Sequence, residues 1–88
     1  YKVKKRNVGK NIVLDQREAE ELFKIIGAKI TYYRRLKGVR QIDLAMETGI
    51  SEQYLSRIEH GEKSKGLSVY VLVAIAAALD VKLEDLIN

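Results

Sequence analysis

Side chains that could catalyse a reaction are few in this sequence. Its 88 residues include one histidine, His60, and no cysteine, and they contain no glycine-rich phosphate loop and no metal-ligand spacing. The tyrosines, aspartates and glutamates are scattered and form no pair of nucleophile and base. We therefore expect no enzymatic activity, no metal ion and no cofactor.

Hydrogen-bonding side chains instead gather in one short segment. If Leu55 and Ile58 face the core from a helix over 52–60, four polar residues form an outward stripe at the spacing i, i+3, i+4 and i+7: Gln53, Ser56, Arg57 and His60. The amide of glutamine and the guanidinium of arginine can each make two directed hydrogen bonds. The stripe can therefore bind a polar ligand along one line of a helix.

The residues around this stripe predict two short helices that cross at a steep angle. Ala45, in a helix over 41–48, is small enough for close approach, and Gly49 tolerates the positive φ that a tight turn needs. Ser51 is a good N-cap for the helix over 52–60. These features in this order predict a helix-turn-helix unit.

The spacing of apolar residues predicts three further helices. They cover residues 16–37, the segment that Ser68 opens and Leu79 ends, and residues 82–87. Residues 11–14 are the one strand candidate, and we expect that strand to be isolated. The predicted fold is all-α, with five helices in one domain over residues 16–88 and an arm over residues 1–15 that contains one short strand.

The pattern resembles the phage-repressor and Cro-like, or XRE-type, helix-turn-helix family. The resemblance extends from about residue 26 to the end and rests on these residues: Ile30, Tyr33, Arg34, Gln41, Leu44, Ala45, Gly49, Ile50, Ser51, Leu55, Ser56, Arg57, Ile58, Glu59, Gly61, Leu72, Ile75 and Leu79. It implies a lambda-repressor-like fold that binds double-stranded DNA sequence-specifically. The expected function is that of a transcriptional regulator, a repressor that reads an inverted repeat as a homodimer.

The resemblance places the helix over 52–60 in the major groove of DNA. There an Arg side chain can pair with guanine and a Gln side chain with adenine, and we expect base contacts from Glu52, Gln53, Ser56 and Arg57. Two roles stay open for Glu52, because it can accept a hydrogen bond from cytosine or favour the helix N-terminus through the helix dipole.

Other residues are expected at the DNA backbone or inside the fold. Gln41 begins a helix, where backbone N–H groups favour anions, and the expected backbone contacts are Arg40, Gln41, Ser51, Tyr54, Lys63 and Lys65. Tyr54 has an alternative role, which is to pack on the preceding helix. For Arg34 and Glu59 the resemblance implies a structural ion pair between the first and third helices.

The net charge of +4 is concentrated at the N-terminus. The first ten residues contain five bases and no acid, whereas the other 78 contain eleven bases and twelve acids. This basic arm is either a solvated tail or a contact with DNA, and both interpretations stay open. The sequence has no cysteine, no apolar stretch that could span a membrane and no signal-peptide pattern, so we expect a cytoplasmic protein.

All eleven residues from Val69 to Leu79 are apolar. The core is expected to use Val69, Leu72, Ile75, Ala76 and Leu79, which leaves an outer face of Tyr70, Val71, Ala74 and Ala77. Because a helix that is apolar all round is normally covered, we expect a second subunit of a homodimer on this face, or the chain's own residues 12–14 folded back over it. The alternative function is an antitoxin-like module that neutralises a partner protein and autoregulates its operon.

Overall fold

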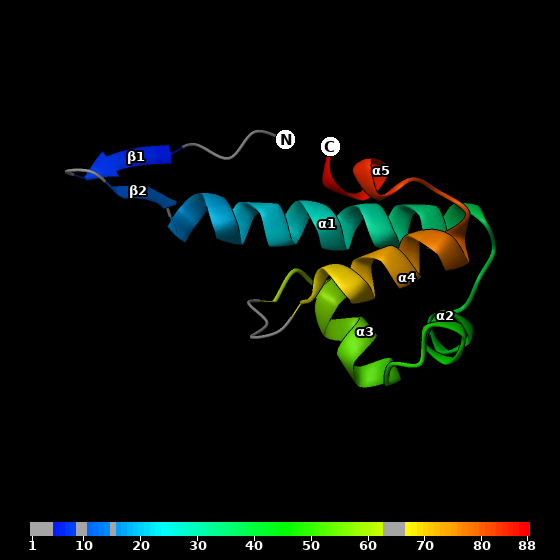
Figure 1. Ribbon diagram of the computed structural model, residues 1–88. Helices are drawn as coiled ribbons and strands as arrows, with labels where there is room; N and C mark the ends of the chain where they lie inside the picture. Colours follow the sequence, from blue (N-terminus) through cyan, green and yellow to red (C-terminus); the bar gives the residue numbers. More distant parts are fainter. Residues whose placement is uncertain (1–4, 9–10, 15, 63–66) are drawn as a thin grey trace.

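The computed structural model describes residues 5–8, 11–14, 16–62 and 67–88. These residues form two strands and five helices, in the order β1 (Lys5–Val8), β2 (Asn11–Leu14), α1 (Gln16–Leu36), α2 (Gln41–Thr48), α3 (Glu52–Glu59), α4 (Val69–Leu79) and α5 (Leu83–Ile87) (Figure 1). The five predicted helices are all present, and their bounds differ from the prediction by at most one residue. The predicted all-α, lambda-repressor-like architecture is confirmed.

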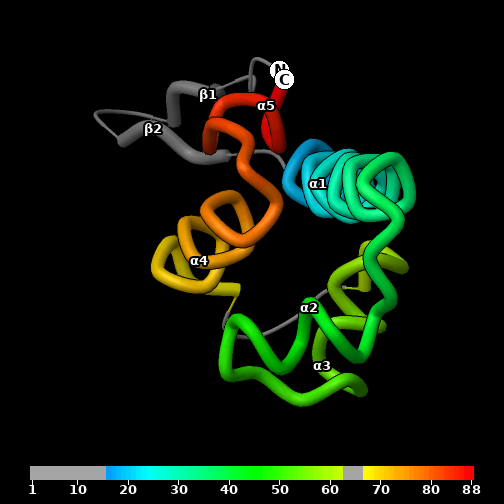
Figure 2. The backbone as a smooth tube through the Cα atoms, turned by 90° about the vertical axis from the view of Figure 1, so that its right-hand side faces the viewer, coloured from blue at the N-terminus to red at the C-terminus, as the bar shows by residue number. Residues whose placement is uncertain are grey.

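The helices surround a single core under α1. The long α1 lies along one side and contacts α3, α5 and α4, while α2 packs against α3 and α4. Figure 2 looks along α1 and shows α5 on one side of it and the crossing of α2 and α3 on the other. Each helix gives the core at least one fully buried side chain: Ile30, Leu44, Leu55, Ile75 and Leu86. Burial of each such side chain stabilises the fold by about 1.5–3 kcal/mol.

Helix ends are set by local hydrogen bonds that the sequence predicts. The Ser51 hydroxyl accepts from the Tyr54 backbone N–H at 3.0 Å and caps α3, and the Ser68 hydroxyl accepts from the Val71 N–H at 3.1 Å and caps α4. Gly49 ends α2 with φ at 73°, a left-handed conformation that glycine adopts at little cost. These caps fix where α2 ends and where α3 and α4 begin.

The strand prediction is correct for β2 and wrong about its isolation. The antiparallel partner of β2 is β1, in a register that runs from Lys5 opposite Leu14 to Val8 opposite Asn11. The sequence of β1, Lys-Arg-Asn-Val, lacks the alternation of apolar and polar residues that marks a strand. Its extended form comes from pairing with β2, a relation that its own composition does not encode.

The outer face of α4 differs from the prediction. Val69 was expected in the core, but it is 67% exposed, and Val73 is 48% exposed beside it. The predicted outer residue Val71 is instead partly buried and packs against the core. Residues 11–14 pair with β1 and Tyr70 stays 81% exposed, so the fold-back of residues 12–14 over α4 is wrong. Although α4 is wholly apolar, no helix in the described ranges is long and apolar enough to cross a membrane.

Candidate nucleic-acid interface

The turn between α2 and α3 is fixed by close packing and by two backbone hydrogen bonds, the first from the Gly49 N–H to the Met46 carbonyl oxygen at 3.3 Å. Leu44 and Ala45 of α2 are buried against Leu55 of α3 in the shared core. After Gly49, the Ile50 N–H donates to the carbonyl oxygen of Ala45 at 3.1 Å. The small side chain of Ala45 lets the two helices approach closely, as the sequence predicts, and α3 is thereby held at a defined angle to α2.

The residues expected to contact bases lie together on the outer side of α3. Glu52, Gln53 and Arg57 are exposed, and Ser56 is partly exposed. His60, the fourth member of the predicted stripe, is also exposed, and its Nδ1 lies 2.7 Å from the Ser56 carbonyl oxygen. The outward residues of α3, the stripe together with Glu52, therefore present an amide, a carboxylate and a guanidinium that have no packing role in the core.

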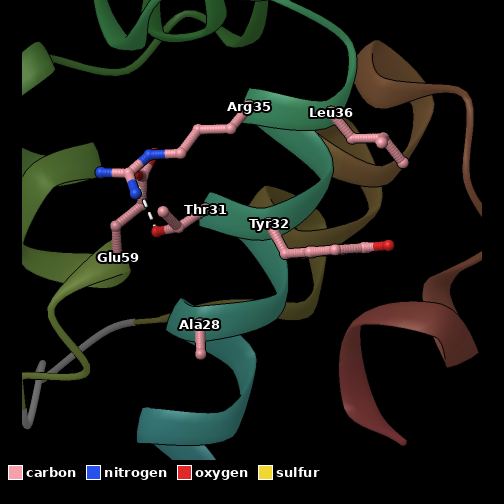
Figure 3. A pocket seen from close by; sticks show the side chains of 6 residues that line it. All are labelled: Ala28, Thr31, Tyr32, Arg35, Leu36 and Glu59. Carbon is pink, nitrogen blue, oxygen red and sulfur yellow. Dashed lines mark hydrogen bonds between the residues drawn. The ribbon is translucent and has the colours of Figure 1, made fainter.

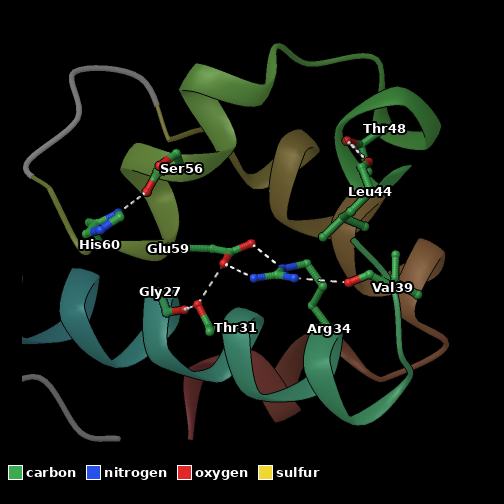
Figure 4. A network of polar contacts seen from close by, with 9 residues as sticks. All are labelled: Gly27, Thr31, Arg34, Val39, Leu44, Thr48, Ser56, Glu59 and His60. Carbon is green, nitrogen blue, oxygen red and sulfur yellow. Dashed lines mark hydrogen bonds and ion pairs between the residues drawn. The ribbon is translucent and has the colours of Figure 1, made fainter. Parts of the chain in front are cut away.

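A polar network holds the end of α3 against α1. Arg34 Nε donates to Glu59 Oε2 at 2.8 Å and its Nη2 donates to Oε1 at 2.9 Å, while Nη1 donates to the Val39 carbonyl at 3.0 Å. Thr31 Oγ1 lies 2.9 Å from Glu59 Oε1 (Figure 3). The side chains of Arg34 and Glu59 are only 12% and 4% exposed. As Figure 4 shows, the Arg34–Glu59 pair joins α1, α3 and the α1–α2 loop, which is a structural role.

Two glycines allow α3 and the residues after it to lie close to α1, and our sequence reasoning missed both roles. A Cβ on Gly27 would lie 2.7 Å from the carbonyl oxygen of Glu59 and closer still to that of Ile58. Gly61 has φ at 71°, and a Cβ there would lie 2.7 Å from Lys24 Cα. The sequence signal was Gly27 itself, because glycine inside a helix costs about 0.5–1 kcal/mol relative to alanine.

Arg40 and Gln41 stand at the N-terminus of α2, as predicted, but Arg40 already has a partner. Its Nε and Nη2 donate to the two carboxylate oxygens of Asp43 at 2.9 and 3.1 Å. These side-chain hydrogen bonds lower the pKa of Asp43 below its ordinary value and raise the pKa of Arg40. The pair is on the surface, where such contacts add little to stability. Arg40 must therefore exchange Asp43 for any phosphate that it binds.

The other residues predicted to contact the DNA backbone differ in their exposure. Ser51 is exposed and its hydroxyl caps α3, whereas Gln41 is partly exposed. The Tyr54 side chain is partly buried and packs against the core, which agrees with the packing alternative for this residue. Lys63 and Lys65 lie outside the described residues.

The crossing of α2 and α3 over Gly49, with the polar side of α3 outward and the core behind it, defines a helix-turn-helix domain. Residues 30–86 match the helix-turn-helix family HTH_3. The chain belongs to this family, and the predicted resemblance to XRE-type, Cro-like regulators is confirmed. Membership of a family of DNA-binding transcriptional regulators also agrees with the prediction that the chain is not an enzyme.

The chain is similar to several bacterial regulators. The transcriptional regulator SlrR of Bacillus subtilis is 41% identical over 64 residues, which make up 73% of this chain and 41% of SlrR. SinR of Bacillus licheniformis is 36% identical over 64 residues, which are 73% of this chain and 57% of that protein. The chain thus spans about half the length of these two relatives.

Solved structures show the same fold. The clp gene regulator ClgR of Corynebacterium glutamicum superposes with a TM-score of 0.69 at 32% identity, over 74% of this chain and 67% of that chain. The biofilm regulator SinR in complex with DNA superposes with a TM-score of 0.65 at 35% identity, over 72% of this chain and 98% of that chain. A solved complex of SinR with the protein SinI is also similar to this chain.

Proposed function

We propose that this chain is the sequence-specific DNA-binding domain of a repressor that reads an inverted repeat in double-stranded DNA as a homodimer. The observation that carries the proposal is the exposed stripe on α3, presented by a helix-turn-helix unit whose other side is buried. The complex of the similar protein SinR with DNA supports it. Because a transcriptional regulator must reach the DNA, the cytoplasm remains the proposed location.

Base contacts are assigned to Glu52, Gln53, Ser56 and Arg57, because an α-helix fits the major groove and these side chains reach outward from α3. Backbone contacts are assigned to Arg40, Gln41, Ser51, Tyr54, Lys63 and Lys65. The N-terminus of α2 supports this assignment for Gln41, since its backbone N–H groups favour an anion.

Selection of bound sequences from a random duplex library tests sequence-specific binding. We expect an enriched inverted repeat, with half-sites about one helical turn, or roughly 34 Å, apart. Arg57→Ala should then weaken binding to that sequence by about 1–3 kcal/mol and relax the preference at one base pair. If Arg57→Ala weakens binding to selected and random DNA equally, Arg57 does not read a base.

For the basic arm we propose sequence-tolerant contacts with phosphates or the minor groove. Its first ten residues contain five bases and no acid, which supports this interpretation over a solvated tail. Deletion of residues 1–10 should lower the slope of log K against log salt by up to about 0.9 for each phosphate that the arm neutralises. An unchanged slope would return the arm to the role of a solvated tail.

The proposed homodimer uses the outer face of α4, with Tyr70, Val71, Ala74 and Ala77 as its predicted residues. The exposure of Tyr70, together with that of Val69 and Val73, supports an interface on this face, because monomers rarely expose contiguous apolar surface. The partly buried Val71 belongs to its edge.

Sedimentation tests the dimer directly. Tyr70→Glu and Ala74→Glu each place a charge on the proposed interface and should shift the protein to a monomer, whereas Lys82→Glu, at an exposed position before α5, should not. Circular dichroism confirms that each variant is folded. If both α4 variants sediment and bind the selected DNA like the parent, α4 is not the dimer face.

The second candidate function is an antitoxin-like module that neutralises a partner protein and autoregulates its operon. The exposure of Met46 (76%) and Ile42 on α2, in addition to the face of α4, favours it. The complex of SinR with SinI is a precedent in which a similar protein binds another protein. A pull-down from the native host distinguishes the two functions, since a stoichiometric protein partner would favour the second.

A further inference from the structure

We propose that the outer face of α1 is a second self-association surface, on which the α1 helix of another copy packs antiparallel. The surface, here called the α1 seam, consists of Glu18, Glu21, Ile25, Ala28, Tyr32 and Arg35. Among them Glu21, Ala28, Tyr32 and Arg35 are exposed, whereas Glu18 and Ile25 are partly exposed. None of the six belongs to the α3 stripe or to the face of α4, so this inference goes beyond the proposed DNA binding and α4 dimer.

The spacing of the seam is that of a helix–helix interface. Successive members are three, four, three, four and three residues apart, which is the repeat that keeps one line of a helix facing a partner helix. The seam spans 17 residues of rise, or about 26 Å. The buried residues Ile26 and Ile30 occupy the opposite side of α1, so the seam has no role in the core.

The chemistry of the seam is complementary to itself when reversed. If a two-fold axis passes between Ile25 and Ala28, the N-terminal end of the seam in one copy lies beside the C-terminal end of the seam in the other copy. Glu18 would then face Arg35 of the second copy, Glu21 would face the Tyr32 hydroxyl, and Ile25 would face Ala28. Glu18 and Glu21 also make interactions within their own chain. The proposed pairing with the second copy rests on the positions of these two carboxylates along α1.

The charge of α1 as a whole favours the same arrangement. Its residues 16–23 contain three acids and one base, whereas residues 24–36 contain four bases and no acid. A parallel neighbour would bring like charges together, but an antiparallel neighbour aligns each half with the opposite charge. The charge pattern therefore selects a second copy in one orientation.

The surface around Ala28 is shaped to receive a side chain. Two shallow depressions share Ala28 and Tyr32, one of about 620 Å³ on the side of Arg35 and Leu36 and one of about 370 Å³ on the side of Ile25. Figure 3 shows Tyr32 and Leu36 extending to one side of α1 and Arg35 to the other, with the short Ala28 side chain one turn below. Ile25 of the second copy fits such a hole as a knob.

One helix pair buries less than the roughly 800 Å² per partner of a standard interface, so this contact is weak and forms where copies are concentrated. Cysteine cross-linking detects a weak contact, and the sequence has no cysteine of its own. In the antiparallel arrangement the two copies of Ala28 are offset by about 4–5 Å along the helix axis. With the helix axes about 8 Å apart, the facing Cα atoms are about 5.5–6 Å apart, a separation that a disulfide can span.

The test compares Ala28→Cys with Glu47→Cys, a position on α2 that is also exposed. Under mild oxidation the Ala28→Cys protein should form disulfide dimers several-fold faster than the Glu47→Cys protein. Equal rates would overturn the α1 seam. Thermal melts of both proteins establish that they are folded.

Charge reversal in the Ala28→Cys background tests the orientation. Glu18→Arg alone or Arg35→Glu alone gives both ends of the seam the same charge, so each variant should cross-link as slowly as the Glu47→Cys control. When the two variants are mixed, opposite charges face each other again at both ends of the seam. The two variants should then cross-link with each other at the original fast rate. If the mixture is as slow as its components, or if neither substitution slows cross-linking, antiparallel pairing through α1 is wrong.

Discussion

The substitution Gly27→Ala adds one methyl group at the tightest contact between α1 and α3. Its Cβ would lie 2.7 Å from the carbonyl oxygen of Glu59 and closer still to that of Ile58. An ordinary contact between carbon and a carbonyl oxygen is about 3.3 Å or longer. Because both neighbours are backbone atoms, no side-chain rotation can relieve the overlap, and α3 must move away from α1 by at least about 0.6 Å.

Two effects of opposite sign decide the result of Gly27→Ala. Replacing glycine by alanine inside a helix normally stabilises the protein by about 0.5–1 kcal/mol, whereas overpacking a tight contact costs typically about 1–3 kcal/mol. The contact with two backbone carbonyls favours the upper part of that cost, so we expect the free energy of unfolding to fall by about 1–2 kcal/mol. The displaced α3 should also weaken binding to the selected DNA more than binding to random DNA.

Urea denaturation followed by circular dichroism measures the stability of Gly27→Ala. The matched control is Ala19→Gly, which removes a methyl from a partly exposed position of the same helix and should lower the free energy of unfolding by about 0.5–1 kcal/mol through helix propensity alone. That control should leave the ratio of specific to random DNA binding unchanged. If Gly27→Ala is as stable as the parent protein or more stable, close approach of α1 and α3 does not limit the fold, and the reasoning is refuted.

Three other substitutions test the polar contacts. Glu59→Ala leaves Arg34 in a nearly buried place without its carboxylate and should lower the free energy of unfolding by about 3–5 kcal/mol in urea denaturation, and a decrease below about 1 kcal/mol would show that Arg34 finds water instead. Ser51→Ala removes the cap of α3 and should cost about 1 kcal/mol in the same assay, with no change expected if water replaces the cap. Arg40→Ala should raise the midpoint of the Asp43 carboxyl in an NMR pH titration, because hydrogen bonds from Arg40 lower its pKa. The ion pair of Arg40 and Asp43 is therefore present above the ordinary range of aspartate titration and breaks as the pH falls through the lowered pKa. An unmoved midpoint would show that the two side chains do not interact in solution.

The helices could be predicted from the sequence because their ends are encoded locally. Ser51 and Ser68 cap α3 and α4 through their own hydroxyl groups, and Gly49 ends α2 in the left-handed conformation that favours glycine. The orientation of α3 also follows from periodicity, since Leu55 and Ile58 are its only large aliphatic residues and both are buried. Once that buried side is fixed, the outward stripe is determined.

Features that depend on a neighbour were not predictable in the same way. An all-apolar α4 has no contrast between its sides, so periodicity could not show that Val69 is exposed and Val71 is partly buried. The strand β1 exists through its pairing with β2. Gly27 carries no chemical group, and its role becomes visible only when the backbone of α3 is placed beside it. In each case the decisive information lies in another part of the chain.

Positioning and recognition are assigned to different sides of α3, and this separation has a consequence for specificity. Leu55, Ile58 and Glu59 hold the helix in place through the core and the Arg34 network, while Gln53 and Arg57 are exposed and lie outside the core. Outward residues can therefore be replaced with little change in folding stability, since surface substitutions usually alter it by less than about 0.5 kcal/mol. Inward substitutions affect stability and DNA binding together, because a helix that has moved presents every outward side chain at the wrong distance. The fold thus allows the preferred DNA sequence to change through α3 alone, as long as the contacts with α1 and α2 are kept.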